Sequence, residues 1–288
     1  MNYWEQGNKC YNHAMPKSRL DSLLTLRGLV DSPSLAQRMV MAGQVRVNGQ
    51  VALKPSTMVD AAAEITLEGE PRYVSRGGEK LEAGLQAFPI QVREQVCADV
   101  GASTGGFTDC LLQHGAAKVY AIDVGYGLLH WKLRSDPRVA LMERTNARYV
   151  VSLPEAVSLV TIDASFISLK ILLPAAAGWF GPCGGEVVAL IKPQFEAGRK
   201  EVSRGDGVIH DSLVHRQVLL DVLGFAQSAG YSLCGLLISP LRGPKGNVEF
   251  LAHLRYPRME PPDPTGEGLG LEEQVTELLK IGYTTSGL

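Results

Sequence analysis

Residues 96–107 read VCADVGASTGGF, an apolar run that leads into a glycine-rich turn. The run predicts a β-strand, and the residues after the turn can begin a helix. The glycines should therefore lie at the carboxyl edge of a sheet, where a ligand can approach the backbone. The spacing is neither G-x-G-x-x-G nor a loop ending in Gly-Lys-Ser/Thr, which disfavours NAD and ATP. We therefore expect a binding loop for a ligand without a pyrophosphate.

The next predicted strand ends at Asp123, 22 positions after Gly101. A carboxylate there can accept hydrogen bonds from a ribose diol, which suits S-adenosylmethionine, a ligand with a ribose and a sulfonium. Asn146, after the third strand, can read an adenine edge. The alternatives are a plain glycine turn with a helix-capping Asp123, and a turn role for Asn146. The candidate cofactor-binding residues are Asp99, Gly101, Ala102, Ser103, Thr104, Gly105, Gly106, Phe107, Asp123 and Asn146.

Strand-like and helix-like segments alternate on both sides of this loop. The strand-like runs are 96–100, 119–123, 139–142, 159–163 and 187–191. This alternation predicts an α/β fold, a parallel sheet with helices on both faces. Runs 231–239 and 248–254, joined by a tight turn, predict a hairpin that closes the sheet. A Pro-rich stretch at 257–264 and one terminal amphipathic helix are expected after it.

Residues 15–70 predict a separate small α+β unit. Ser18 is expected to cap a first helix, and a second helix should run from Ser32-Pro33 to Gly43. Asn48-Gly49 suits a type I′ turn between two short strands, and a further strand is expected at 65–67. Residues 15–54 carry a charge of +4, although the whole chain carries −2. An RNA-binding face and a merely solvated face both explain this charge.

The composition of the 288 residues is that of an ordinary globular protein, with 45% hydrophobic and 20% charged residues. No apolar stretch reaches the 18 residues typical of a membrane span, and Met1–Ala14 lacks the apolar block of a signal peptide. We therefore expect a cytoplasmic protein that does not cross a membrane. The five scattered cysteines indicate reduced thiols.

Ionisable residues stand where the predicted strands end. Asp163 and Lys192 each follow an apolar run, Glu249 lies in the last hairpin, and Lys80 precedes the first strand of the sheet. Such residues at the ligand-binding edge of an α/β sheet are site candidates, although each alone is more often salt-bridged. Two further groups of basic residues flank the same edge, with solvated loop charges as the alternative. They are Arg199, Lys200 and Arg204 after the run at 190–198, and Arg242 and Lys245 in the final turn.

Four motifs carry a resemblance to a known family. DVGASTGGFTDCLL (99–112), DASFISL (163–169), LIKPQFEAG (190–198) and NVEF (247–250) are similar to the TlyA family of ribosomal RNA 2′-O-methyltransferases, some of which are called hemolysin A. Its catalytic domain is FtsJ-like. The first unit, with RLD at 19–21 and GQVRVNGQ at 43–50, resembles the RNA-binding domain of small-subunit ribosomal protein four. The resemblance covers residues 15 to about 256, so no inherited function is expected for the two ends.

The resemblance implies a Rossmann-like methyltransferase sheet, S-adenosyl-L-methionine as cofactor and ribosomal RNA, within assembled subunits, as partner. The domains would be an extension (1–14, expected to be disordered), the small RNA-binding domain (15–70), a linker (71–76), the methyltransferase domain (77–256) and a Pro-rich linker with a terminal helix (257–288). The family's catalytic tetrad falls on Lys80, Asp163, Lys192 and Glu249. The candidate RNA-binding residues are Arg19, Arg38, Arg46, Arg72, Arg76, Arg199, Lys200, Arg204, Arg242 and Lys245.

The tetrad suits 2′-O-methylation, because a ribose hydroxyl is a poor nucleophile that needs deprotonation or a strong acceptor. Lys192 can serve only when neutral, and Lys80 as a second cation beside it would favour that form. Which lysine is the base stays open. The six histidines show no HExxH or paired-Cys spacing, so no metal is expected. The rival interpretations are an idle methyltransferase fold that only binds ribosomal RNA, and a pore-forming hemolysin.

Overall fold

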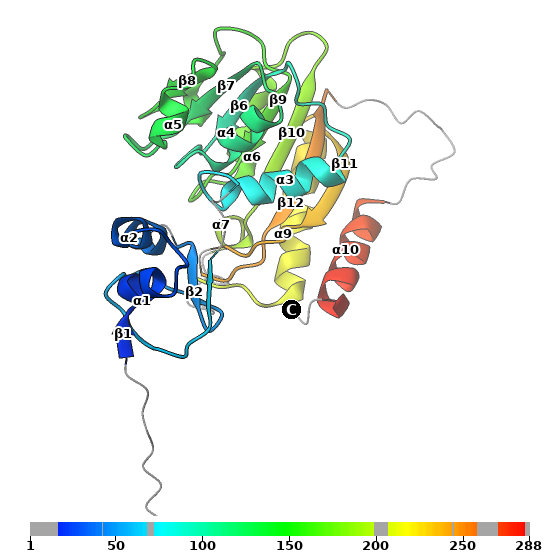
Figure 1. The fold of residues 1–288 in the computed structure, drawn as a ribbon. Coiled ribbons are helices and arrows are strands. Elements are labelled where there is room, and N and C mark those ends of the chain that lie inside the picture. Colours follow the sequence, from blue (N-terminus) through cyan, green and yellow to red (C-terminus); the bar gives the residue numbers. More distant parts are fainter. Residues whose placement is uncertain are drawn as a thin grey trace, which may run out of the picture. The chain divides into compact units, whose positions relative to one another are not determined.

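The computed structural model describes residues 17–41, 43–67, 72–198, 207–243, 245–257 and 270–285. The chain divides into two compact units, residues 1–71 and 72–288. Figure 1 shows the course of the chain through both units. The predicted extension 1–14 and most of the Pro-rich stretch lie outside the described residues.

The amino-terminal unit combines two short helices with short strands. Its elements are β1 (Lys17–Arg19), α1 (Leu20–Leu26), α2 (Pro33–Met41), β2 (Val45–Val47), β3 (Gln50–Val51), β4 (Met58–Asp60) and β5 (Ile65–Leu67). β2 pairs with β3 and β5, and β1 pairs with β4, all antiparallel. The expected turn is present, since Asn48 and Gly49 both have positive φ. The helices and strands of this unit enclose a small apolar core, whose fully buried residues include Leu20, Leu24, Val40 and Val45.

The predicted cap of the first helix is wrong. Ser18 lies in β1 opposite Val59, so its backbone belongs to a strand pair and the helix begins only at Leu20. The residue before the helix is Arg19, whose guanidinium donates two hydrogen bonds to Asp21. This pairing lowers the pKa of Asp21 to about 2.

The second unit contains the predicted sheet. Its strands are β6 (Val96–Val100), β7 (Lys118–Ile122), β8 (Val139–Met142), β9 (Leu159–Ile162), β10 (Gly185–Ile191), β11 (Ser232–Ile238) and β12 (Phe250–Tyr256), in the order β11-β12-β10-β9-β6-β7-β8. The pairs from β10 to β8 are parallel, and β12 is antiparallel to both of its neighbours. The α/β fold class and the closing hairpin are therefore confirmed. After β6 the chain adds strands on one side and then returns to the other, which leaves a crevice at the carboxyl ends of β6 and β9.

Helices cover both faces of this sheet (Figure 1). α3 (Gly77–Ala87) and α4 (Gly106–Gln113) pack on each other over one face, and α6 (Leu169–Ala177) and α9 (Ser212–Ser228) over the other. α10 (Leu271–Thr285), the expected terminal helix, packs on α9 and β11. The remaining elements are α5 (Trp131–Arg134), η1 (Ala147–Tyr149) and α7 (Pro193–Glu196). None of the described helices is long and apolar enough to cross a membrane.

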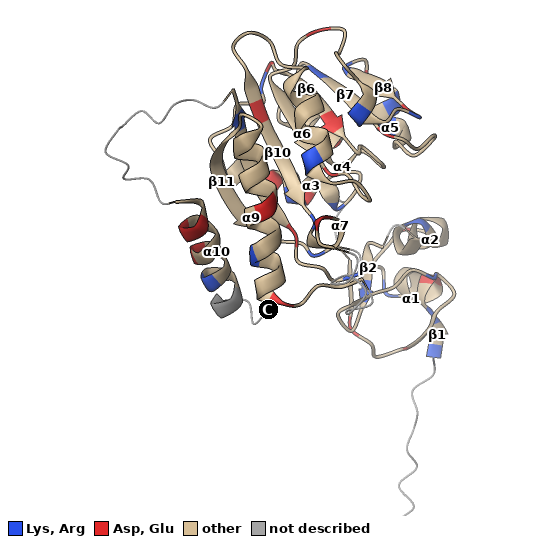
Figure 2. Cartoon of the chain, turned by 180° about the vertical axis from the view of Figure 1, so that it is seen from behind, with Lys and Arg blue, Asp and Glu red and all other residues tan. Residues whose placement is uncertain are grey.

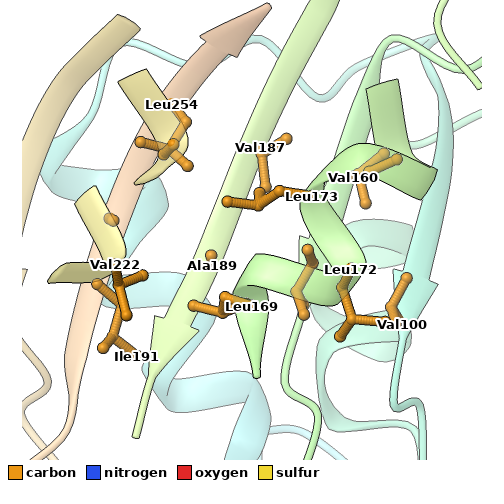
Figure 3. Packing of buried hydrophobic residues seen from close by; sticks show 14 of the residues in the cluster. Val100, Val160, Leu169, Leu172, Leu173, Val187, Ala189, Ile191, Val222 and Leu254 are labelled. Carbon is orange, nitrogen blue, oxygen red and sulfur yellow. The ribbon is translucent and has the colours of Figure 1, made fainter. Parts of the chain in front are cut away.

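Alternate residues of each strand enter different cores. Val100, Val160 and Ala189 pack beneath α6 and α9, as Figure 3 shows, whereas Cys97 and Leu159 pack beneath α3 and α4. A strand residue therefore finds apolar neighbours on either face, which explains the continuous apolar runs of the sequence. The polar residues that end these strands are left at the sheet edge.

Candidate active site

A cavity of about 560 Å³ opens at the carboxyl ends of β6, β7 and β9. Its apolar lining includes Ile122, Leu128 and Ile171, and its polar lining includes Asp123 and Asn146. A mainly apolar cleft of this size with a few directed polar groups is the usual form of a small-molecule site. A second cavity of about 210 Å³ adjoins it, and both are lined by Gly101, Ser103, Asp163 and Ser165.

The structure places most of the predicted cofactor-binding residues at these cavities. Gly101, Ser103, Asp123 and Asn146 line the larger one, and Gly101, Ala102, Ser103, Thr104, Gly106 and Phe107 line the smaller one. Asp99 and Gly105 line neither cavity. Gly105 has a φ of +97° and precedes α4, and a Cβ there would overlap Leu129 and Leu133. The left-handed backbone favours glycine here, since both contacts are with the flexible ends of leucine side chains, and a direct contact of Gly105 with a cofactor stays a prediction.

Asp123 ties the glycine loop to the loop after β7. Its carboxylate accepts the backbone N–H of Ser103 and that of Gly125, each at 2.7 Å. Each carboxylate oxygen keeps a further lone pair that can face the cavity. Asn146 accepts the N–H of Arg148 and caps η1, so the predicted turn role is present and its side chain also lines the cavity.

The four residues of the predicted tetrad come together as two ion pairs. Lys192 Nζ lies 2.5 Å from Oδ1 of Asp163, and Lys80 Nζ lies 2.5 Å from Oε2 of Glu249. Both lysines are more than nine-tenths buried, and both line the smaller cavity together with Asp163. Each lysine therefore has its own carboxylate partner. The sequence had suggested that Lys80 lies beside Lys192 and favours its neutral form. In the structure, the charged group that contacts each lysine is a carboxylate.

Asp99 is the last but one residue of β6, just before the glycine loop, and it is fully buried. Its carboxyl group accepts hydrogen bonds from Thr108 at 2.6 Å and Thr161 at 3.1 Å. Burial, and after it the charge of Asp163, raise the pKa of Asp99 to about 7, against the lowering effect of these hydroxyls. A direct contact with a cofactor stays a prediction, since the side chain lines neither cavity.

Replacing Asp99 with Asn should change how stability depends on pH. A raised carboxyl pKa gives stability that is present at low pH and lost as the pH rises through the folded value. The wild type should therefore lose stability relative to the Asp99→Asn variant between about pH 4 and pH 7, by up to roughly 1.4 kcal/mol per pKa unit. Urea unfolding of both proteins at several pH values measures this difference.

Asp21 and Glu82 have carboxyl pKa values lowered to about 2, so they contribute stability that is lost as the pH falls toward that value, and this contribution is the same in both proteins. Asp221→Asn is a matched control, because Asp221 is exposed and pairs with Lys170 at 2.7 Å. It should leave the pH profile unchanged. Parallel profiles for the wild type and Asp99→Asn would contradict a neutral buried Asp99.

The predicted RNA-binding residues have different surroundings. Those that are exposed include Arg38, Arg76, Arg242 and Lys245. Arg72 pairs with Glu82 at 2.9 Å, and Arg46 donates to the carbonyl of Gly49. Figure 2 shows basic residues on β1, β2 and α2 of the amino-terminal unit. Arg199, Lys200 and Arg204 lie outside the described residues.

Some cavity residues were not named as site candidates from the sequence, although Phe166 and Ser168 belong to the motif DASFISL. Ser75 and Gly77 line the smaller cavity, and Arg148, Phe166 and Ser168 line the larger one. Each of these residue types is common in loops, so only the position in the fold marks these residues as part of the site.

Among the described residues, Glu82, Cys110 and His114 bring possible metal ligands within 4.8 Å of one another. The Glu82 carboxylate already accepts hydrogen bonds from Tyr73 at 2.7 Å and pairs with His114 at 2.6 Å. These bonds outweigh burial and hold the pKa of Glu82 at about 2. The hydrogen bonds explain this cluster, and the expectation of a reaction without a metal stays a prediction.

A seven-stranded mixed sheet with a glycine loop and a carboxylate at neighbouring strand ends is a Rossmann-like architecture with its ligand site at the carboxyl edge. The model of the FtsJ-like methyltransferase family matches residues 73–256, and that of the S4 domain matches residues 18–65. The chain belongs to the TlyA family of FtsJ-like methyltransferases, which confirms the resemblance seen in the sequence.

Three relatives illustrate the similarity. YqxC of Bacillus subtilis, provisionally named as an rRNA methyltransferase, is 48% identical, with 92% of each chain covered. The 16S/23S rRNA (cytidine-2′-O)-methyltransferase TlyA of Mycobacterium tuberculosis is 44% identical, with 92% of this chain and 98% of the relative covered. A solved structure from Streptococcus thermophilus that is named as a hemolysin is 44% identical, with a TM-score of 0.69 and coverage of 96% of this chain and 100% of that chain.

Proposed function

We propose that this protein transfers the methyl group of S-adenosylmethionine to the 2′-hydroxyl of a cytidine in ribosomal RNA. The observation that carries the proposal is that Lys80 and Lys192, both buried and each paired with a carboxylate, line a cavity that adjoins a larger, ligand-sized one. An RNA-binding S4 domain on the same chain supports RNA as substrate.

The residues around the larger cavity fit S-adenosylmethionine. A Cβ at Gly101 would lie 2.8 Å from the carbonyl oxygen of Asp163, so the backbones there lie too close for a side chain to intervene. Asp123 can accept the ribose hydroxyls, and Ile122 and Leu128 supply apolar surface for an adenine. The cavity of about 560 Å³ lies within the range of small-molecule sites.

When bound, the cofactor supplies an electrophilic methyl group on its sulfonium. The residues of the smaller cavity act on the ribose hydroxyl, whose proton must leave as the oxygen forms its bond to carbon and the carbon–sulfur bond breaks. Lys192, with its Nζ within 3.4 Å of both Asp163 and Ser165, is positioned to accept this proton in its neutral form. Asp163 then stabilises the resulting ammonium, and Glu249 holds Lys80 in the same cavity.

A direct assay tests this function. The protein is incubated with S-adenosylmethionine carrying a labelled methyl group and with each purified ribosomal subunit, and the label is mapped to a nucleotide and to its 2′-oxygen. Label on a cytidine ribose is the expected result. Label on a base, or on neither subunit, would overturn the proposal, and binding to a subunit without transfer would favour the idle-fold alternative.

The amino-terminal unit is proposed to select the ribosomal RNA. Replacing both Arg38 and Arg46 with Ala should weaken subunit binding at every salt concentration. The fall of log affinity with log salt should also become less steep, by about 1 for each phosphate that the variant no longer neutralises. Arg19 is a poorer choice, because its bond to Asp21 stabilises the unit itself.

Binding is measured by filter retention at several salt concentrations. Arg216→Ala is the control, since Arg216 lies on α9 and pairs with Glu272. An unchanged salt slope in the double variant would argue against an RNA contact by these two residues.

A further inference from the structure

The loops after β9 and β10 contact each other at successive points. Lys192 pairs with Asp163 and also donates a hydrogen bond to Oγ of Ser165 at 3.2 Å. A little further along, the rings of Phe166 and Phe195 lie 4.7 Å apart between their centroids. The two loops are therefore joined at the end where the proposed reaction takes place.

Glu196 makes the last contact of this series, and it has no part in the chemistry described above. Its Oε2 accepts the hydroxyl of Ser168 at 2.6 Å, and its Oε1 accepts the backbone N–H of Leu169 at 2.8 Å. Ser168 is the N-cap of α6 and Leu169 its first residue. Glu196, from another element, therefore satisfies an N–H that has no partner within its own helix and meets the positive end of the helix dipole.

The segment between these two attachments forms a wall of the larger cavity. Residues 163–168 all line that cavity. Within the segment, Phe166 has a φ of +64°, a strained conformation for a non-glycine residue that persists only where its surroundings hold it. Lys192 holds the start of the segment, and Glu196 holds its end.

The position of Glu196 is costly for a carboxyl group. Burial raises the pKa of Glu196, against the lowering effect of its two hydrogen bonds. An apolar residue would avoid this cost but would leave the hydroxyl of Ser168 and the N–H of Leu169 without their acceptor. The carboxylate therefore contributes a directed attachment that apolar packing cannot replace.

We propose that Glu196 is a positioning residue, which holds the segment 163–168 in the conformation that presents Asp163 and Ser165 to Lys192 and completes the wall of the cofactor cavity. The inference rests on the proposed roles of Asp163 and Lys192. The glutamate of the LIKPQFEAG motif is Glu196, and it positions the segment through its hydrogen bonds to Ser168 and Leu169.

The test compares Glu196→Ala with Glu196→Gln in the full-length protein. The alanine variant should transfer methyl groups on the order of 10- to 100-fold more slowly, because small displacements of reacting groups cost that much. Its cofactor affinity should fall several-fold, while KM for the ribosomal subunit stays unchanged, since the defect lies beyond the RNA-binding step. The glutamine variant keeps an acceptor for the N–H of Leu169 and an amide for the Ser168 hydroxyl, so it should recover most of the rate.

Two further variants make the result decisive. Lys170→Ala is the matched control: Lys170 stands next to Leu169 on α6 and forms an ion pair with Asp221 of α9 at 2.7 Å, and it should have wild-type kinetics. If Glu196→Ala does not fold, Ser168→Ala replaces it and must also slow transfer, because it removes one of the two attachments. Wild-type transfer in Ser168→Ala would overturn the inference.

Lys192→Ala, assayed in parallel, separates this inference from the proposed function. An inactive Lys192→Ala together with a fully active Glu196→Ala would overturn the positioning role alone. A fully active Lys192→Ala would overturn the catalytic assignment, and the positioning role with it. Slow transfer by Glu196→Ala, recovery in Glu196→Gln and normal rates in Lys170→Ala support the proposal.

Discussion

Lys192→Ala is expected to transfer methyl groups on the order of 100-fold or more slowly than the wild type, the scale of a proton-transfer or positioning group. Its affinity for S-adenosylmethionine should fall no more than several-fold, because Lys192 lines the smaller cavity and affects the larger one only as an anchor of the segment 163–168. Single-turnover transfer to saturating ribosomal subunits gives the rate, and calorimetry gives the cofactor affinity. The split between the two readouts distinguishes a chemical role from a binding role.

The loss of Lys192 also leaves Asp163 without its cation. Oδ1 of Asp163 is buried, and the Lys192 ammonium 2.5 Å away is the charge that compensates it. Thermal unfolding of the variant therefore has to be measured beside its activity. Lys118→Ala is the control, since Lys118 is a half-exposed lysine at the opposite, amino end of β7 and pairs with Glu155 at 2.7 Å. Normal turnover at saturating RNA would make Lys192 a structural residue.

Gly101→Ala is expected to weaken cofactor binding on the order of 100-fold, which corresponds to about 2.7 kcal/mol. Gly101 has a φ of +83°, and a Cβ there would lie 2.8 Å from the carbonyl oxygen of Asp163 and 3.0 Å from Cα of Ala164. Neither contact is with a flexible side chain, so the methyl group must displace the backbone that forms the cavity wall. The same displacement would move Asp163 away from Lys192.

Gly127→Ala separates this steric effect from backbone strain. Gly127 has a φ of +72°, and a Cβ there would meet nothing within 4 Å. Both variants should lose roughly 1–2 kcal/mol of stability from the left-handed conformation, yet only Gly101→Ala should lose the cofactor. Calorimetric titration of both folded variants measures the difference. Equal affinities would mean that the close approach at Gly101 has no part in binding.

The sheet was predictable because its signals are local. The central strands β6, β7, β9 and β10 are mostly buried, so each appears in the sequence as an apolar run, and glycine and proline mark where the runs end. Asp163 and Lys192 follow two such runs, and the parallel pairing of β9 and β10 brings their ends to one edge. The small unit was predicted for the same reason, through Pro33 and the Asn48-Gly49 turn. Its first cap was predicted wrongly, because the pairing of Ser18 with Val59 joins distant segments.

The details of the site were less predictable, because they depend on which way a side chain faces. Asp99 and Gly101 both belong to the glycine motif. Asp99 turns toward Thr108 and Thr161 in the interior, whereas Gly101 lines the cavities. Gly105 looks like a binding glycine in the sequence, but its φ of +97° is by itself enough to favour glycine at this position.

From the order of its residues alone, this chain specifies an α/β domain with a ligand loop at 101–107, a small basic α+β unit, and a set of ionisable residues at strand ends. Those features depend on neighbours in sequence. The partners within the site depend on strand order instead. Because β12 inserts between β10 and β11, Glu249 reaches Lys80 across 169 positions, and because the β9 and β10 loops are adjacent, Glu196 can cap α6. Contacts between segments so far apart arise only when the packed sheet brings their ends to the same edge.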